Sequence, residues 1–457
     1  MFLSKTLVLI AVLSTSYSIP IPSEYGGVKE YIVPSEVLVK SNIISNSEVE
    51  SNTNHTVDDQ ISVISRGSLP EYCKREHYSI KTPSDMKVID ECHTIVGNID
   101  VSEYNHPLLS LGDIENIIGG LSVKKSPELV RLEAPALASI SEGLVLTELT
   151  SLSLVSFPSL RTVKELEWRV LPILSNVYVS ADINNIERIT VSDSSLTEFS
   201  GFLSNKLEVL DINNNRFLHQ INFNVEEVTK ELHIAANQAD VKVSLPRLKF
   251  ASNVSIHEVA DLNLNELELI NGSASLTNNY FTQLKIPKLK FIGGTLSLLK
   301  NKMLNSVDFP LVTEIGGGLM LVNNTKVEKI NFFPSLNVIG GAIEIVGNIK
   351  ETSFKHLKLV KGSASIHSTS TSFDCAKWLK SDISSVIRGG KIECINANNE
   401  KVVANTPTEG NSTDEDSSYQ YKNVEGVKHL SAATTSYLST LSTIIVAGAS
   451  LLYFLYY

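Results

Sequence analysis

The chain has 457 residues, of which 50 are acidic and 39 are basic, and its formal net charge at pH 7 is −11. A chain of this length can bury a large hydrophobic core. The negative charge argues against nucleic acid or an anionic lipid surface as the main partner, because both repel an acidic protein.

The chain begins with the pattern of a secretory signal peptide, residues 1–18. One early cation, Lys5, is followed by a short apolar run and by small residues before Ile19, as signal peptidase requires. We therefore expect cleavage before Ile19 and an extracellular protein, since a retained membrane anchor fits so short an apolar run less well. Residues 19–69 are rich in Ser and Asn and fit no repeat, so we expect a flexible segment or a processed propeptide there.

One sequence pattern recurs through the middle of the chain. The stretch FPSLNVIGGAIEI at residues 333–345 has close counterparts around Pro287 and Pro310 and weaker ones nearer the N-terminus. From Asp113 to Lys355 the pattern makes eleven steps that average about 22 residues. A fixed period of this length is typical of a solenoid.

The residues of one repeat predict its local structure. Alternating apolar positions such as Ile343 and Ile345 indicate a half-buried β-strand, and Pro and Gly-Gly mark the strand ends. One such turn cannot bury its own apolar face, so neighbouring turns must stack on it. We predict a mainly β protein, a capped right-handed β-solenoid over residues 70–396. The turns within 164–202 stay unassigned, because Gly-Gly is missing and proline is irregular there.

The cysteines fall in two local pairs at opposite ends of the repeats, Cys73 with Cys92 and Cys375 with Cys394. Four cysteines permit three connectivities, but pairs this close in a secreted chain most simply form two separate disulfides. A zinc site is the alternative, and the absence of a histidine cluster and an oxidising compartment disfavour it. The disulfides would close caps over the open ends of the solenoid, which otherwise invite pairing with another chain.

Asparagines recur at two positions of the repeat. One set lies nine or ten residues before the proline position, and we expect it to form a structural ladder of side-chain hydrogen bonds rather than to bind a ligand. This ladder comprises Asn215, Asn278, Asn301 and Asn324. Sequons for N-glycosylation occur at Asn54, Asn253, Asn271, Asn323 and Asn411. Asn253 and Asn271 occupy the glycine positions of their turns, so we expect that edge of the solenoid to face solvent.

The C-terminal part of the chain predicts a stalk and a lipid anchor. Residues 397–430 are rich in Ser, Thr and Asn and contain the acidic run 414–416, which is more typical of a solvated stalk than of a metal site. In residues 431–457, three small residues from Ser431, a polar spacer and an apolar end form the pattern of a GPI-anchor signal. We expect attachment at Ser431, with a single membrane span as the alternative.

The sequence contains no recognisable catalytic site. Candidate acid–base carboxylates such as Glu226, Glu227, Glu266 and Glu268 occupy repeat positions that vary from turn to turn, and the histidines show no metal spacing. We therefore predict no catalytic residue, no metal site and no cofactor. Of the two tryptophans, Trp378 and Trp168, the first is expected to pack in a cap. The region of the second is a candidate for a binding surface.

Taken in order, these features resemble a family. A signal peptide, the stretch ECHTIVGNIDV, repeats that end in FPSLNVIGGAIEI, the closing FDCAKWLKSDISSVIRGGKIEC and a GPI signal are similar to fungal GPI-anchored cell-wall organisation proteins of the sporulation-specific protein 2 type. The resemblance covers about residues 70–396 and both ends. It implies repeats like those of receptor L domains, a family of leucine-rich-repeat folds. The cysteines Cys73, Cys92, Cys375 and Cys394 and the anchor site Ser431 carry over.

The resemblance also implies a function. It implies a non-enzymatic surface glycoprotein needed for cell-wall organisation, with ascospore wall assembly in the sporulation-specific branch. The expected location is the outer leaflet of the plasma membrane or the wall, and the expected partners are β-glucan or wall proteins, with the membrane reached through the GPI lipid. Two alternatives stay open: a GPI-anchored glucan-remodelling enzyme, and a receptor-like binder of a glycan or protein.

Overall fold

The computed structural model describes residues 69–180, 183–200, 204–380, 382–405 and 422–423. All of them belong to the second of two units into which the chain divides, Gly67–Tyr457. The signal peptide, most of the stalk, the anchor signal with Ser431, and the sequons at Asn54 and Asn411 lie outside the described residues.

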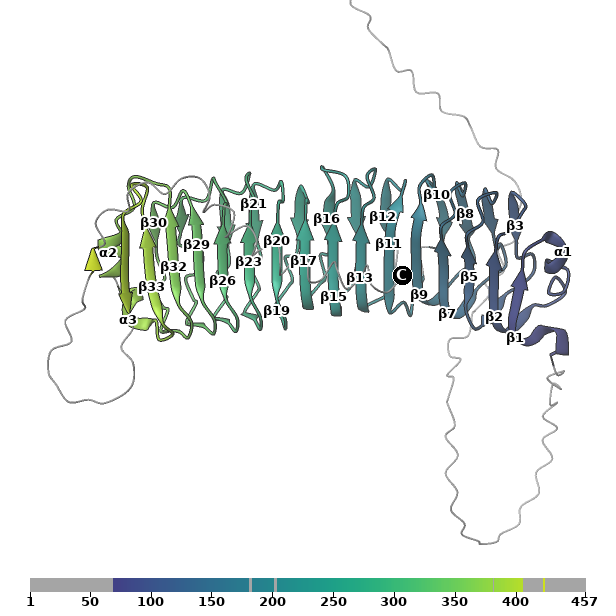
Figure 1. Cartoon of the computed structure of the whole chain (residues 1–457). Coiled ribbons are helices and arrows are strands. Elements are labelled where there is room, and N and C mark those ends of the chain that lie inside the picture. Colours follow the sequence, from purple (N-terminus) through teal and green to yellow (C-terminus); the bar gives the residue numbers. More distant parts are fainter. Residues whose placement is uncertain (1–68, 181–182, 201–203, 381, 406–421, 424–457) are drawn as a thin grey trace, which may run out of the picture. The chain divides into compact units, whose positions relative to one another are not determined.

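The described chain is a parallel β-solenoid of about 13 turns spaced roughly 22 residues apart, as predicted. In each turn the chain passes along a 23-stranded main sheet, crosses to a second side of short strands, and returns (Figure 1). The handedness of the coil stays a prediction.

The main sheet contains unbroken strands and strands split in two. The unbroken strands are β1 (Lys74–Ile80), β2 (Thr94–Ser102), β7 (Ser139–Thr147), β9 (Thr162–Leu171), β11 (Arg188–Ser194), β13 (Lys206–Asn213), β15 (Glu227–Ala235) and β17 (Phe250–His257). The split strands are β4 (Asn116–Ile118) with β5 (Leu121–Lys124), β19 (Leu269–Ile270) with β20 (Ala274–Thr277), β22 (Phe291–Ile292) with β23 (Leu296–Leu299), β25 (Glu314–Ile315) with β26 (Leu319–Val322), β28 (Val338–Ile339) with β29 (Ile343–Gly347), and β31 (Leu359–Val360) with β32 (Ala364–Ser368).

The second side is divided into four short parallel sheets. They comprise β3 (Leu108–Ser110), β6 (Arg131–Glu133), β8 (Leu154–Phe157) and β10 (Asn176–Val179); β12 (Glu198–Ser200), β14 (Gln220–Asn222), β16 (Lys242–Ser244) and β18 (Asp261–Asn263); β21 (Gln283–Lys285) and β24 (Ser306–Asp308); and β27 (Lys329–Ile330) and β30 (Glu351–Thr352).

The core forms because inward side chains stack on the same position of the next turn. Leu166 pairs with Ile189, Ile189 with Leu210, and Leu210 with Leu232, and all four are buried. Burying an aliphatic side chain of this size stabilises the fold by about 1.5–3 kcal/mol. The alternation of apolar and polar residues along each strand thus produces one continuous core along the solenoid.

Glycine pairs interrupt strands of the main sheet, and we call each such interruption a glycine kink. Where a pair such as Gly340-Gly341 is present, one long strand is split into β28 and β29, and both parts stay in the main sheet. Strand β9 has no glycine at this level and runs on unbroken over ten residues, whereas the split between β31 and β32 contains a single glycine, Gly362. The described part of the unassigned region 164–202 contains turns without a glycine pair.

Both ends of the stack are capped, and each local cysteine pair forms a disulfide, as predicted. Cys73 bonds to Cys92 and Cys375 to Cys394. The first cap contains the 3₁₀ helix η1 (Glu71–Cys73) and α1 (Pro83–Met86). The second contains α2 (Cys375–Leu379), α3 (Asp382–Val386), β33 (Lys391–Ile395), β34 (Lys401–Asn405) and β35 (Lys422–Asn423).

The second cap ends the parallel stack in two ways. The side chain of Trp378 in α2 is buried, as predicted for a packing residue. Strand β33 pairs with β32 in parallel, but β34 pairs with β33 in antiparallel orientation. This reversal replaces the open parallel edge with a different hydrogen-bonding pattern.

Candidate binding surface

In most turns the main-sheet strand ends at a corner made by two residues with different roles. The first residue has a positive φ, for example 55° at Asn278 and 55° at Lys300, and its side chain is exposed. The second residue points into the solenoid. In five turns this inward residue is a buried asparagine: Asn215, Asn237, Asn279, Asn301 and Asn324.

These buried asparagines bond from turn to turn. Asn301 is typical: its Nδ2 donates to the Leu276 carbonyl at 2.9 Å and to Asn324 Oδ1 at 3.1 Å. Its Oδ1 accepts from the backbone N–H and the Nδ2 of Asn279 at 2.9 and 3.0 Å. The asparagine side chains therefore satisfy backbone groups that the corner leaves without a strand partner.

The predicted asparagine ladder contained one wrong residue, Asn278, and lacked one true member, Asn237. Asn278 is the exposed corner residue, and Asn279 takes the inward place. Asn237 is also a member: it donates to the Ile212 carbonyl at 2.9 Å, and its Oδ1 accepts from the Asn215 backbone. The sequence contained a signal for both, because each lies 22 residues from another member, Asn215 or Asn301.

The outer face of the main sheet carries a band of mostly polar side chains, which we call the polar band. Its first row follows the register across six strands and comprises Thr190, Asp211, His233, Ser255, Ser275 and Ser297. Its second row, two residues further along the strands, comprises Asn213, Ala235, His257 and Thr277. Successive members of a row are separated by the strand spacing of about 4.8 Å.

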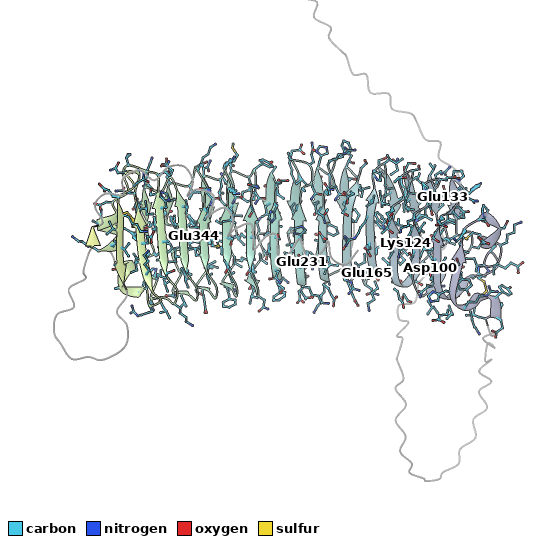
Figure 2. All side chains as sticks on the ribbon, in the orientation of Figure 1. Asp100, Lys124, Glu133, Glu165, Glu231 and Glu344 are labelled. Carbon is cyan, nitrogen blue, oxygen red and sulfur yellow. A yellow bond between two sulfur atoms is a disulfide. The ribbon has the colours of Figure 1, made fainter. Side chains whose placement is uncertain are left out.

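The polar band is nearly free of charge, whereas the face beyond it is not. Its one carboxylate, Asp211, accepts a hydrogen bond from Asn213 Nδ2 at 2.8 Å. Charged side chains flank the band along the main sheet, with Asp100 and Lys124 toward the N-terminal end and Glu344 toward the C-terminal end (Figure 2). Apart from Asp211 and the two histidines, the polar side chains of the band are uncharged hydroxyl and amide groups.

Two imidazoles lie side by side in the polar band. The ring centroids of His233 and His257 are 6.2 Å apart, and Ser255 Oγ lies 2.9 Å from His257 Nε2. Burial lowers the pKa of His257, and the neighbouring His233 lowers it further. The His257 ring is therefore held in its neutral form and adds no charge to the band at neutral pH.

Trp168 does not contribute to any surface. Its side chain is fully buried, and its ring centroid lies 6.1 Å from that of Phe199. The expectation that its region is a binding surface was wrong for this residue, because the unbroken strand β9 turns Trp168 inward.

The carboxylates that the sequence offered for catalysis are all paired with cations. Lys206 pairs with Glu227, Lys249 with Glu226, Lys288 with Glu266, and Lys290 with Glu268, at N–O distances of 3.4, 3.0, 2.6 and 2.7 Å. The hydrogen bonds from Lys249 and Lys290 lower the pKa values of Glu226 and Glu268. A general acid of a glycosidase needs a raised pKa instead, so these groups are typical of ion pairs between turns.

This pairing makes stability depend on pH. Because the folded-state pKa of Glu268 is lowered, its pair with Lys290 contributes stability above the usual pKa of 4.5 and loses it as the pH falls through the folded-state value. We expect Glu268→Gln to unfold at a lower urea concentration than the wild type at pH 7, and at the same concentration near pH 2. A difference that persisted in acid would contradict this origin of the effect.

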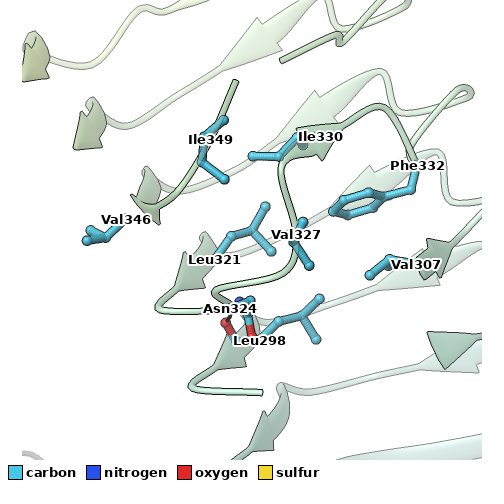
Figure 3. Close-up of a pocket in the computed structure, with 9 residues that line it drawn as sticks. All are labelled: Leu298, Val307, Leu321, Asn324, Val327, Ile330, Phe332, Val346 and Ile349. Carbon is cyan, nitrogen blue, oxygen red and sulfur yellow. Dashed lines mark hydrogen bonds between the residues drawn. The ribbon is translucent and has the colours of Figure 1, made fainter. Parts of the chain in front are cut away.

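One cavity among the described residues lies inside the solenoid, where it contacts Asn324 and apolar side chains such as Leu298 and Phe332 (Figure 3). Its volume is about 10 Å³. That volume holds one water at most. No group of three metal-ligating side chains occurs in the part of the chain that the structure describes.

Three of the predicted glycosylation sites are described, and each has an exposed side chain. Asn253 and Asn271 lie at the level of the glycine kink, and Asn323 is a corner residue with a φ of 58°. Exposure is a requirement for glycosylation, and the modification itself stays a prediction. Among the described residues, no helix is long and apolar enough to span a membrane.

The fold and this surface define a class of protein: a capped parallel β-solenoid whose main sheet carries a mostly uncharged, polar outer band. Comparison with known proteins shows to which family within this class the chain belongs. The chain is 36% identical over 403 residues to Sporulation-specific protein 2 of Saccharomyces cerevisiae, covering 85% of this chain and 80% of that protein. It is 38% identical over 343 residues to Sporulation-specific protein 22 of the same yeast, covering 73% of each.

A third relative extends the comparison beyond yeast. The chain is 32% identical over 317 residues to a cell surface GPI-anchored protein of Arthroderma benhamiae, covering 69% of this chain and 81% of that protein. The chain therefore belongs to this fungal family of sporulation-specific and cell-surface GPI-anchored proteins, as the sequence motifs predicted. No protein-family model and no solved structure matches it.

Proposed function

We propose that the chain is a GPI-anchored glycoprotein of the fungal cell surface that organises the cell wall by binding polysaccharide and catalyses no reaction. The observation that carries the proposal is the polar band. Relatives named as cell-surface proteins and as a cell wall mannoprotein support the location. The names of the two sporulation-specific relatives support a role in sporulation, and together with the wall location they lead us to propose the ascospore wall as the place of action.

The polar band suits a neutral polysaccharide such as β-glucan. Sugar hydroxyls both donate and accept hydrogen bonds, and so do the hydroxyls of Ser255, Ser275 and Ser297. A single hydrogen bond of this kind contributes about 1 kcal/mol. A row of them on a rigid sheet adds many such bonds along an extended chain. The band would therefore hold one polymer along the solenoid axis.

The non-enzymatic part of the proposal is supported by the paired carboxylates. A retaining or inverting glycosidase needs two carboxyl groups that face the scissile bond, one of them protonated. The lysine partners of Glu226 and Glu268 favour the ionised forms instead. Measuring the chain lengths of the oligosaccharides after incubation tests the alternative that the protein is a glucan-remodelling enzyme.

The experiment uses the full chain, expressed in fungal cells and released with a phospholipase that cuts GPI anchors. Release is the expected result if Ser431 carries the anchor, and chain that stays on the cells would contradict it. The released protein is immobilised and incubated with defined β-glucan and chitin oligosaccharides. We expect β-glucan to be retained without any change in its length, whereas new chain lengths would overturn the non-enzymatic proposal.

Variants of the polar band make the experiment specific. Ser275→Lys with Ser297→Lys places two long cations in the band, and we expect retention to weaken about tenfold, or 1.4 kcal/mol. The matched control, Gln283→Lys with Ser306→Lys, adds the same charge to β21 and β24 on the second side. Equal retention by the band variant and the control would show that the band is not the binding surface.

A further inference from the structure

The edge of the solenoid that follows the proline position carries a column of side chains from successive turns. Backbone hydrogen bonds connect Lys249, Glu268 and Lys290 from one turn to the next at 2.9 Å each. In this part of the edge every cation meets an acid, since Lys249 pairs with Glu226 and Lys290 with Glu268. The charges there cancel.

Toward the C-terminal end, cations and acids no longer alternate in the same column. It continues through Thr313 and Asn337 to Lys358, again by backbone hydrogen bonds of 2.8–2.9 Å. The side chain in the turn before Lys358 is therefore a neutral amide, not a carboxylate. Lys358 is exposed and forms no ion pair with any described residue.

Lys361 occupies the position that Gly293, Gly316 and Gly340 hold in the three preceding turns. Its backbone N–H donates to the Ile339 carbonyl at 3.0 Å, which places it after Gly340. A Cβ on Gly389 of the following turn would lie 1.9 Å from the Lys361 carbonyl oxygen, so these two residues stack directly. Gly340 in the preceding turn has no side chain, and the neighbour with a side chain in the following turn is Arg388, another cation, so neither turn neutralises the Lys361 ammonium.

Arg388 lies beside Lys361, because its backbone N–H donates to the Val360 carbonyl at 2.8 Å. One arm of its guanidinium, Nη1, donates to the carbonyls of Ser385 and Ile387. The Nε and Nη2 edge makes no hydrogen bond within the described chain. That edge has the fork geometry that binds two oxygens of one phosphate or carboxylate group.

With Lys355, which is also exposed, these residues form a cationic edge: Lys355, Lys358, Lys361 and Arg388. The charge is local, because residues 350–405 contain nine basic and five acidic residues in a chain whose net charge is −11. None of the four cations has an ion-pair partner among the described residues. Unpaired cations grouped on an acidic protein indicate an anionic partner.

We propose that the cationic edge binds a polysaccharide that carries phosphate groups. The Arg388 fork would hold one phosphate bidentately, and the lysines would act as point charges for neighbouring groups on the same chain. The bare glycines beside Lys361 leave room for a polymer to approach the backbone. The inference rests on the proposed location at the cell wall but not on the polar band, which would bind neutral chains.

The experiment measures binding of the full-length protein, purified in detergent, to a phosphorylated mannan oligosaccharide and to the same oligosaccharide after phosphate removal. The test variant replaces Lys355, Lys358, Lys361 and Arg388 with glutamine. We expect it to bind the phosphorylated probe at least about tenfold more weakly than the wild type does, equivalent to 1.4 kcal/mol. Binding by the wild type should weaken as salt is added, because exposed charges are screened.

A matched control variant replaces three other lysines and one other arginine with glutamine, all of them ion-paired in the structure: Arg247, Lys249, Lys288 and Lys290. It changes the net charge by the same amount and should keep the affinity. Equal losses in both variants, or equal binding of the dephosphorylated probe, would overturn the proposal.

A membrane is the competing source of phosphate. Vesicles of phosphatidylserine and phosphatidylcholine that bound through the same four residues, with no binding of the glycan, would also overturn the proposal. Failure of the β-glucan experiment would leave this inference intact, because the two experiments use different surfaces and different variants.

Discussion

Replacing Asn301 with alanine is expected to lower the free energy of unfolding by about 3–5 kcal/mol. Asn301 is fully buried. Without its side chain, the Leu276 carbonyl and the Asn279 backbone N–H lose the partners described above. Leaving one buried polar group unsatisfied costs about 1–3 kcal/mol, and the small cavity that alanine leaves adds to this. Urea unfolding followed by circular dichroism measures the effect.

The control for this prediction is the neighbouring asparagine of an adjacent turn. Asn278 is exposed and its side chain makes no hydrogen bond among those the structure shows. The next turn has lysine at this corner, Lys300, with the same φ of 55°. Asn278→Lys should therefore change the free energy of unfolding by less than about 0.5 kcal/mol. Similar losses for both substitutions would show that the ladder does not stabilise the corners.

Replacing Gly316 with alanine is expected to lower the free energy of unfolding by about 2–3 kcal/mol, because it overpacks the kink of the main sheet. A Cβ at this position would lie 2.2 Å from the carbonyl oxygen and 3.0 Å from the carbonyl carbon of Gly293 in the preceding turn. Both atoms are backbone, so neither can rotate away. The two turns must separate locally, which weakens their hydrogen bonds.

Gly143 supplies the matched control for the kink. It lies in the unbroken strand β7, and the nearest atom to an added Cβ is 3.5 Å away, at Glu165 Cβ. Gly143→Ala should therefore leave the melting temperature unchanged or raise it slightly, since alanine restricts the unfolded chain. If Gly316→Ala were as well tolerated as Gly143→Ala, close stacking of the glycine columns would not explain why the kinks contain glycine.

The period of about 22 residues was sufficient to predict the solenoid, because each repeat must stack on its neighbours to bury its apolar face. The cysteine pairs were sufficient to predict the caps, because each pair is local in the chain. The corner at the end of the main-sheet strands was harder to predict. Asn278 and Asn279 are adjacent, and the sequence alone does not show which one turns inward. The positive φ of Asn278 decides it.

The two candidate surfaces could not be predicted from the sequence, because both depend on register between turns. Ser255, Ser275 and Ser297 are 20 and 22 residues apart, and only the strand pairing shows that they lie in one row. Likewise, Lys361 and Arg388 are neighbours because the cap returns the chain to the edge of the main sheet. The burial of Trp168 was not predicted for a related reason. Its region lacks the glycine pair that marked the other repeats, so the sequence did not show that β9 is one continuous strand.

The unbroken and split strands stack in the same sheet with one core beneath them, and this has a consequence for how the surface can vary. Each turn contacts only the turns before and after it. A change of outward side chains in one turn therefore leaves the rest of the scaffold in place. The Gly-Gly turns and the turns without them are two interchangeable modules of one architecture. A family built on it can alter its outer face one strand at a time without redesigning the protein beneath.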